Sequence, residues 1–128
     1  MISFDHHELD ALSVEMPRLG IKGAKVMSNV LEQGADDLRD AWRHNAEQTA
    51  GDHGKHYPKA IEAHRVVSTD LVFEIGPNPA KPQGGMSFEF GSTNQPAHLD
   101  GQIAAGEMVP VINGRIQTAL FHLFGLSK

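Results

Sequence analysis

The sequence contains no cysteine, no long apolar run and no block of basic residues. The absence of cysteine excludes disulfides and thiol-based catalysis. No apolar stretch approaches the ~18 residues that a membrane-spanning helix needs. The first residues, Met1 to Glu8, have neither the basic start nor the apolar run of a secretory signal peptide. We therefore expect a protein that is made and folded in a cytoplasm and has no membrane partner.

Positive charge is scarce and dispersed. Eleven Lys and Arg residues stand against sixteen Asp and Glu residues, which gives a formal net charge of -5. Nucleic-acid binding needs clustered basic residues that release phosphate counterions, so a dedicated nucleic-acid binder is disfavoured. An acidic wall can still line a channel through which DNA passes, because it does not hold the DNA.

The length and composition are those of a single small globular domain. The chain has 128 residues, of which 40% are hydrophobic and 21% charged. A domain of this size buries only about two-thirds of the surface that its unfolded chain exposes, so we expect a modest core and a tendency to self-associate. We assign one domain to residues 1–128, in which 1–17 form an N-terminal extension with a short amphipathic segment at 5–16.

The strongest periodic signal begins near Ile21. Apolar residues recur there at every third or fourth position as far as Trp42, a pattern typical of one long helix with a single buried face. The helix must end before the glycine-rich segment 51–58. Trp42 is the only tryptophan, and its place on the apolar stripe predicts that it anchors the core.

The middle of the chain predicts a small antiparallel sheet. Segments 60–68 and 71–76 are rich in strand-forming residues, and Thr69-Asp70 would connect them tightly. Segment 77–85 holds three prolines and two glycines. It is predicted to be a long flexible loop, neither helix nor central strand, that orders on assembly. Met86 to Phe90 is predicted to be a third strand at the sheet edge.

The end of the chain predicts two helices. Pro96 and Asp100 are start signals for the first, Pro110 is the start signal for the second, and Gly125 is a stop signal. One face of the second helix is apolar and consists of Val111, Ile112, Ile116, Leu120, Leu123 and Phe124. The predicted fold class is therefore α+β, with a long N-terminal helix packed on a small antiparallel sheet and a C-terminal helix.

Eight histidines raise the question of a metal site. His6-His7 lacks the i, i+4 spacing that places two imidazoles on one helical face around zinc. His53 and His56 lie in a loop beside Asp52, but their spacing matches no closed set of ligands. We predict no native metal ion and no cofactor.

The sequence also lacks the constellation of an enzyme. His98 could act as a general base with Glu89 or Asp100, but no nucleophile motif accompanies it. Ser92 does not lie in a Gly-x-Ser-x-Gly elbow. We predict that the chain is not an enzyme and that His98 ties its turn to the sheet by hydrogen bonds.

One stretch resembles a known family. An aromatic segment and a glycine-polar turn are followed by a Pro-Ala-His segment, in the order Phe88-Glu89-Phe90-Gly91-Ser92-Thr93 and then Gln95-Pro96-Ala97-His98. Together with the order of elements over 18–124, this resembles the HK97 gp10-like family of tailed-phage proteins, which lie at the neck between head and tail. The chain departs from the family pattern at Leu99-Asp100. Its Gly106 and Pro110 also predict a break in a helix that is usually continuous in the family.

The resemblance implies a structural virion protein, made in a host bacterial cytoplasm, that forms a homo-oligomeric ring at the head–tail interface. The resemblance also implies that the ring is a hexamer, that it contacts adjacent neck and tail-tube proteins, and that DNA passes through it without specific binding. The predicted edge strand would add to a neighbour's sheet, and the 77–85 loop would dock on the adjacent ring. The assembly interface is assigned to Lys81 and Gln83 in that loop and to Phe88, Phe90, Gly91, Pro96 and His98.

Three alternatives stay open. Within the same class, the protein could be a tail terminator that caps the tail tube instead of a connector. A second class is a non-viral regulatory module whose long helix binds a protein partner. The third is a metal-dependent enzyme built on His53 and His56.

Overall fold

The computed structural model describes residues 2–4, 20–67, 71–93 and 96–125, and the fold is α+β as the sequence predicts. The amphipathic segment predicted at 5–16 and the connection at Thr69-Asp70 lie outside the described residues. The order of elements is β1 (Ile2–Phe4), α2 (Gly20–Thr49), α3 (Tyr57–Ala60), β2 (Ile61–Arg65), β3 (Phe73–Pro77), α4 (Ser87–Phe90) and α5 (Asp100–Leu123).

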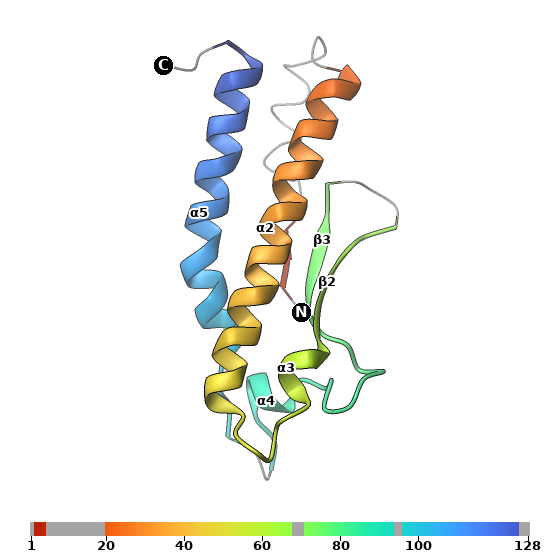
Figure 1. Cartoon of the computed structure of the whole chain (residues 1–128), viewed down its shortest axis with the longest axis vertical. Coiled ribbons are helices and arrows are strands. Elements are labelled where there is room, and N and C mark those ends of the chain that lie inside the picture. Colours follow the sequence, from red (N-terminus) through yellow and green to blue (C-terminus); the bar gives the residue numbers. More distant parts are fainter. Residues whose placement is uncertain (1, 5–19, 68–70, 94–95, 126–128) are drawn as a thin grey trace.

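Helix α2 is the central element of the molecule. It runs for 30 residues, and its buried side chains recur with helical spacing at Leu31, Ala35, Leu38, Trp42 and Ala46. Helix α5 lies along one side of α2, and the sheet lies along another (Figure 1). Trp42 is 1% exposed, so its predicted role as a core anchor is confirmed.

The sheet has the strand order β1-β3-β2, and both pairs are antiparallel. The predicted hairpin is confirmed, with Ile61 paired with Pro77 and Arg65 paired with Phe73. The prediction that Pro77 lies outside a central strand is wrong, because it ends β3 in the middle of the sheet. The described pairing of β1 with β3 stops at Ile75, so the missing N–H of Pro77 removes no ladder hydrogen bond on that side.

The predicted third strand at Met86 to Phe90 is wrong. Ser87–Phe90 is the single-turn helix α4, closed by N–H groups of Phe90 and Gly91 that donate to carbonyls four residues earlier, at 2.9 and 2.7 Å. Phe88 and Glu89 are both buried although they are adjacent, which is not the pattern of an edge strand with one face in solvent. The third strand is instead β1, near the N-terminus.

The predicted pair of C-terminal helices is one continuous helix, α5, with Pro110 in its interior. Proline at this position removes the hydrogen bond to the Gly106 carbonyl. Both residues are exposed, so water can bond that carbonyl, while buried Ala104 and Ile112 hold the helix on either side of the break. The predicted stop is confirmed, because Gly125 follows the helix with a φ of 69°.

Candidate assembly surface

The structure divides the seven predicted interface residues between two regions. Phe88, Phe90, Gly91, Pro96 and His98 belong to the chain around α4 and the approach to α5, whereas Lys81 and Gln83 belong to the 78–86 loop.

Phe88 is part of the core and not of a surface. Its ring is 6% exposed and stacks on Tyr57, with 4.7 Å between ring centroids. The Phe88 carbonyl accepts a hydrogen bond from the His98 N–H at 2.9 Å, and the His98 ring lies edge-on to the Phe88 ring at 5.8 Å. His98 therefore ties its segment to α4, and the prediction that it bonds to the sheet is wrong because α4 occupies the place of the predicted strand.

Phe90, Gly91 and Pro96 have different environments. Phe90 is 57% exposed and is the aromatic residue of this motif that a partner could reach. Gly91 has a φ of 85°, which favours glycine, so the predicted sharp turn is present although it follows a helix. Pro96 is exposed in the extended segment before α5.

Glu89 is the functional residue of this region that the sequence did not reveal. Its two carboxylate oxygens accept the Gly101 N–H at 2.8 Å and the Gln102 N–H at 3.0 Å. These N–H groups lie in the first turn of α5, where backbone N–H groups have no partner within the helix. The negative charge of the carboxylate also complements the positive end of the helix dipole. Glu89 is 1% exposed, so α4 positions the buried carboxylate that starts α5.

Asp100 and His98 lie close together, as a general base formed by His98 and Asp100 would require. Together with the Thr49 hydroxyl, however, they are arranged differently from a catalytic triad. Asp100 Oδ2 accepts the Thr49 hydroxyl at 2.7 Å and lies 3.8 Å from His98 Nδ1. The acid therefore lies between the hydroxyl and the imidazole, whereas a triad places the imidazole between the nucleophile and the acid. This arrangement joins α5 to α2 through Asp100 and Thr49.

Tyr57 lies beneath the same junction. Its side chain is fully buried, and its hydroxyl accepts a hydrogen bond from Trp42 Nε1 at 3.2 Å. Burial raises the pKa of Tyr57 to about 12, the Trp42 hydrogen bond opposes the rise, and the nearby carboxylates of Glu89 and Asp100 add to it. The tyrosine is thus held in its neutral form.

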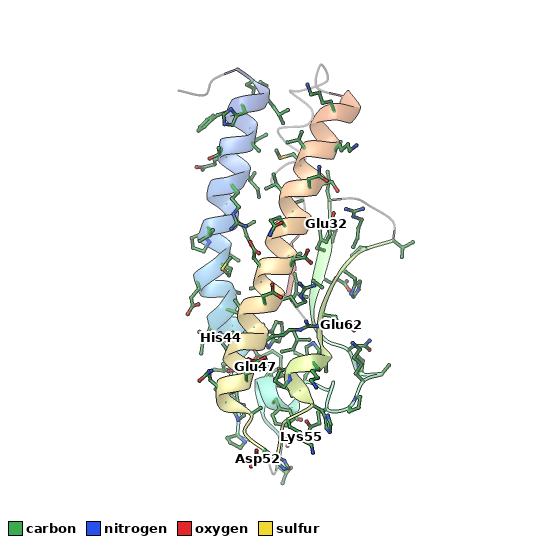
Figure 2. The ribbon with its side chains drawn as sticks, in the orientation of Figure 1. Glu32, His44, Glu47, Asp52, Lys55 and Glu62 are labelled. Atoms are coloured by element: carbon green, nitrogen blue, oxygen red, sulfur yellow. The ribbon has the colours of Figure 1, made fainter. Side chains whose placement is uncertain are left out.

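The 78–86 loop, which was predicted to order on assembly, is hydrogen-bonded to other segments of its own chain. Gln83 Nε2 donates to the His53 carbonyl at 2.6 Å, and Gln83 Oε1 accepts the His56 N–H at 2.8 Å. Lys81 forms an ion pair with Glu62, the residue labelled beside this loop in Figure 2. The hydrogen bonds of Lys81 and Asn78 lower the pKa of the Glu62 carboxyl.

Helix α5 exposes several large apolar side chains. Four of its large hydrophobic side chains are 44 to 51% exposed, namely Ile103, Val111, Phe121 and, just past its end, Phe124. An open groove of about 860 Å³ borders this surface between the first half of α2 and the second half of α5. It is lined by Val26, Asn29, Val30, Gln33, Val111, Gly114, Arg115, Thr118, Ala119, His122 and Leu123.

Comparisons of the chain with protein-family models, with curated proteins and with solved structures each found no match. Within the described ranges, no helix is long and apolar enough to cross a membrane. The same part of the chain holds no group of three or more His, Asp or Glu residues that could bind a metal ion.

Proposed function

We propose that this chain is a structural protein of a tailed phage that self-associates into a ring at the head–tail interface, as a connector or tail-completion protein. The observation that carries the proposal is the exposed apolar surface of α5. Large apolar side chains exposed on a small domain mark surfaces that contact other macromolecules, and α5 exposes Ile103 near its start and Phe121 near its end. The resemblance of the 88–98 motif to HK97 gp10-like proteins supplies the phage context.

The charge distribution supports a partner that is protein and not nucleic acid. Helix α5 carries Glu107, Arg115 and His122 between Gly101 and Leu123, and Arg115 is paired with Asp37 at 2.5 Å. Protein interfaces are depleted of charge at their centre, whereas phosphate recognition requires basic clusters. In the proposed ring, DNA passes through the centre without specific binding.

The predicted interface changes in one respect. Phe88 is buried within the chain, and the segment that was to add a strand to a neighbour is helix α4. The proposed interface therefore moves to the outer face of α5, and Phe90 is the residue of the 88–98 motif best exposed to extend it. Alternatively, the same ring could cap the tail tube as a tail terminator.

A regulatory module that binds a partner through its long helix is the second candidate. It is disfavoured because the apolar stripe of α2 is already covered by the sheet and α5, with Leu31, Leu38 and Trp42 at most 2% exposed. A partner could therefore reach the polar faces of α2 and, at the open groove beside α5, Val26 and Val30.

Cryo-electron microscopy of phage particles that encode this chain tests the proposal, with density for a ring of copies between head and tail as the expected result. Phe121→Asp should remove that ring, because it places a charge in an apolar interface. Gln48→Asp, on an exposed face of α2, is the matched control and should leave the ring intact. Particles that lack the wild-type protein at the neck would contradict the proposed function.

A further inference from the structure

Helix α5 turns one face away from the rest of the molecule. Ile112 points toward α2, because a Cβ atom added to Gly34 of α2 would lie 2.9 Å from the Ile112 side chain. The sheet and α5 lie on opposite sides of α2 (Figure 1), so the face of α5 opposite Ile112 is turned away from both. Residues on that face recur at alternating intervals of four and three positions, the spacing of the seam along which two helices pack. These residues, which we call the α5 seam, are all exposed and are Ile103, Glu107, Pro110, Gly114, Gln117 and Phe121.

The chemistry of the α5 seam is symmetric about its midpoint at position 112. Its two ends are the large apolar residues Ile103 and Phe121, which are 51% and 50% exposed. A carboxylate and an amide come next, and the two central positions are proline and glycine. If two copies pack with their seams antiparallel, each type of residue meets a complementary one. The seam residues of the two copies then meet as Ile103–Phe121, Glu107–Gln117 and Pro110–Gly114.

Charge favours this antiparallel arrangement over a parallel one. Parallel seams in register would oppose Glu107 to Glu107, and like charges across a helix surface are destabilising. In the antiparallel pair, the Gln117 amide of each copy can donate to the Glu107 carboxylate of the other. The helix itself is divided in charge, because no Lys or Arg occurs between Pro82 and Gly114 and no Asp or Glu occurs after Glu107. Antiparallel pairing therefore places the acidic half of each α5 beside the basic half of the other and also opposes the helix dipoles.

We propose that the free protein pairs with a second copy of itself through antiparallel α5 seams. The proline and glycine at the centre of the seam let the two helices approach closely, and the apolar ends leave water. The seam from Ile103 to Phe121 is about 27 Å long. One helix face supplies fewer than the roughly 20–30 residues a side of a standard interface. The pair is therefore expected to dissociate at micromolar concentration.

The symmetry of this contact gives it a place before assembly. The same surface is used on both copies, so the contact joins two molecules and then closes. It cannot join all members of a cyclic ring whose copies face one way. The pair instead covers the face of α5 that the proposed ring uses, and it must open before a copy is incorporated. This role before assembly rests on the proposed function, whereas the pair itself does not.

Sedimentation equilibrium of the purified full-length chain tests the pair and its register. Gln117→Glu opposes two carboxylates at both Glu107–Gln117 contacts, so the dissociation constant of the dimer should rise about tenfold. Glu107→Gln/Gln117→Glu exchanges the two residues and should restore the wild-type dissociation constant. Gln48→Glu, at an exposed position of α2, makes the same change in net charge away from the seam and should leave the dimer unchanged.

Disulfide trapping measures the symmetry of the contact, because the native chain has no cysteine. Oxidation of Glu107→Cys/Gln117→Cys should give covalent dimers and nothing larger, since both disulfides close within one pair. Each single variant should stay monomeric, because its two cysteines lie about 15 Å apart along the antiparallel helices. A disulfide spans no more than ~7 Å between Cα atoms. Circular dichroism before oxidation checks that the variants are folded.

The outcomes separate this inference from the proposed function. A wild-type chain that is still monomeric at ~1 mM, a dimer that Gln117→Glu leaves unchanged, or covalent species larger than dimers would each overturn the antiparallel pair. None of these results bears on a ring seen in phage particles, which would leave the neck role standing. A dimer that Gln117→Glu weakens and the exchanged variant restores supports the pair, even where particles lack the ring and the neck role is wrong.

Discussion

At the scale of single residues, Glu89 joins α4 to the start of α5. Its carboxylate accepts two N–H groups from the first turn of α5 while being 1% exposed. Glu89→Gln keeps the size of the side chain but replaces one acceptor oxygen with a donor NH₂ group. One buried N–H then loses its partner, so we expect a loss of about 1–3 kcal/mol in the free energy of unfolding.

Chemical denaturation followed by circular dichroism measures this loss. The control is Glu47→Gln, the same substitution at an exposed position of α2 labelled in Figure 2, which should change stability by no more than about 0.5 kcal/mol. Equal effects of the two substitutions would show that Glu89 does not hold the start of α5.

At the scale of elements, the contact between α2 and α5 requires glycine at position 101. A Cβ atom added to Gly101 would lie 2.6 to 2.7 Å from atoms of the Trp42 ring. Because Trp42 is buried and interiors are close-packed, Gly101→Ala should push the helices apart, and we expect a loss of about 1–3 kcal/mol. Gly106→Ala on the same helix meets nothing within 4 Å and should raise stability by about 0.5–1 kcal/mol.

Thermal unfolding of the two alanine variants tests this expectation, since the residue exchanged and the helix are the same in both. The melting temperature should fall for Gly101→Ala and rise for Gly106→Ala. A rise in both would mean that the close approach of α5 to Trp42 does not constrain the packing.

Helix α2 was predictable from the sequence, whereas the single-turn helix α4 was not. The three-four spacing through Trp42 continues over many turns, so α2 was predicted correctly. Phe88-Glu89-Phe90 spans only one turn, and its alternation fits a strand as well as a helix. The helical form of α4 places the Glu89 carboxylate where it accepts the Gly101 N–H of α5. This contact joins segments 12 residues apart, so the local sequence pattern does not predict it.

Helix α5 shows the opposite limit. Pro110 is a valid local start signal, but the helix continues through it because Ala104 and Ile112 are both buried. The candidate site was partly predictable for the same reason. The turn at Gly91 follows from local chemistry. The exposure of Phe90, the burial of Phe88 against Tyr57 and the hydrogen bonds of Gln83 depend on segments far apart in sequence.

At the scale of the whole molecule, Tyr57 reports on the junction where the elements meet. It lies in α3 and contacts Trp42 of α2 and Phe88 of α4. Burial raises its pKa from 10.0 to about 12, so the folded protein retains a proton that the unfolded chain releases. This contribution to stability is complete below pH 10 and is lost as the pH rises toward 12.

The chain has a single tyrosine, so its phenolate absorbance can be assigned without ambiguity. We expect the phenolate to appear above pH 10 together with the loss of helical circular dichroism, because ionisation requires the junction to open. In Tyr57→Phe, the fall in stability between pH 10 and 12 should be shallower than in the wild type, and this difference removes the contribution of lysines that titrate in both proteins. Phenolate formation near pH 10 with helicity intact would show that water reaches Tyr57 in the folded state. The junction of α2, α3 and α4 would then not be the closed unit on which the position of α5 and its assembly surface depends.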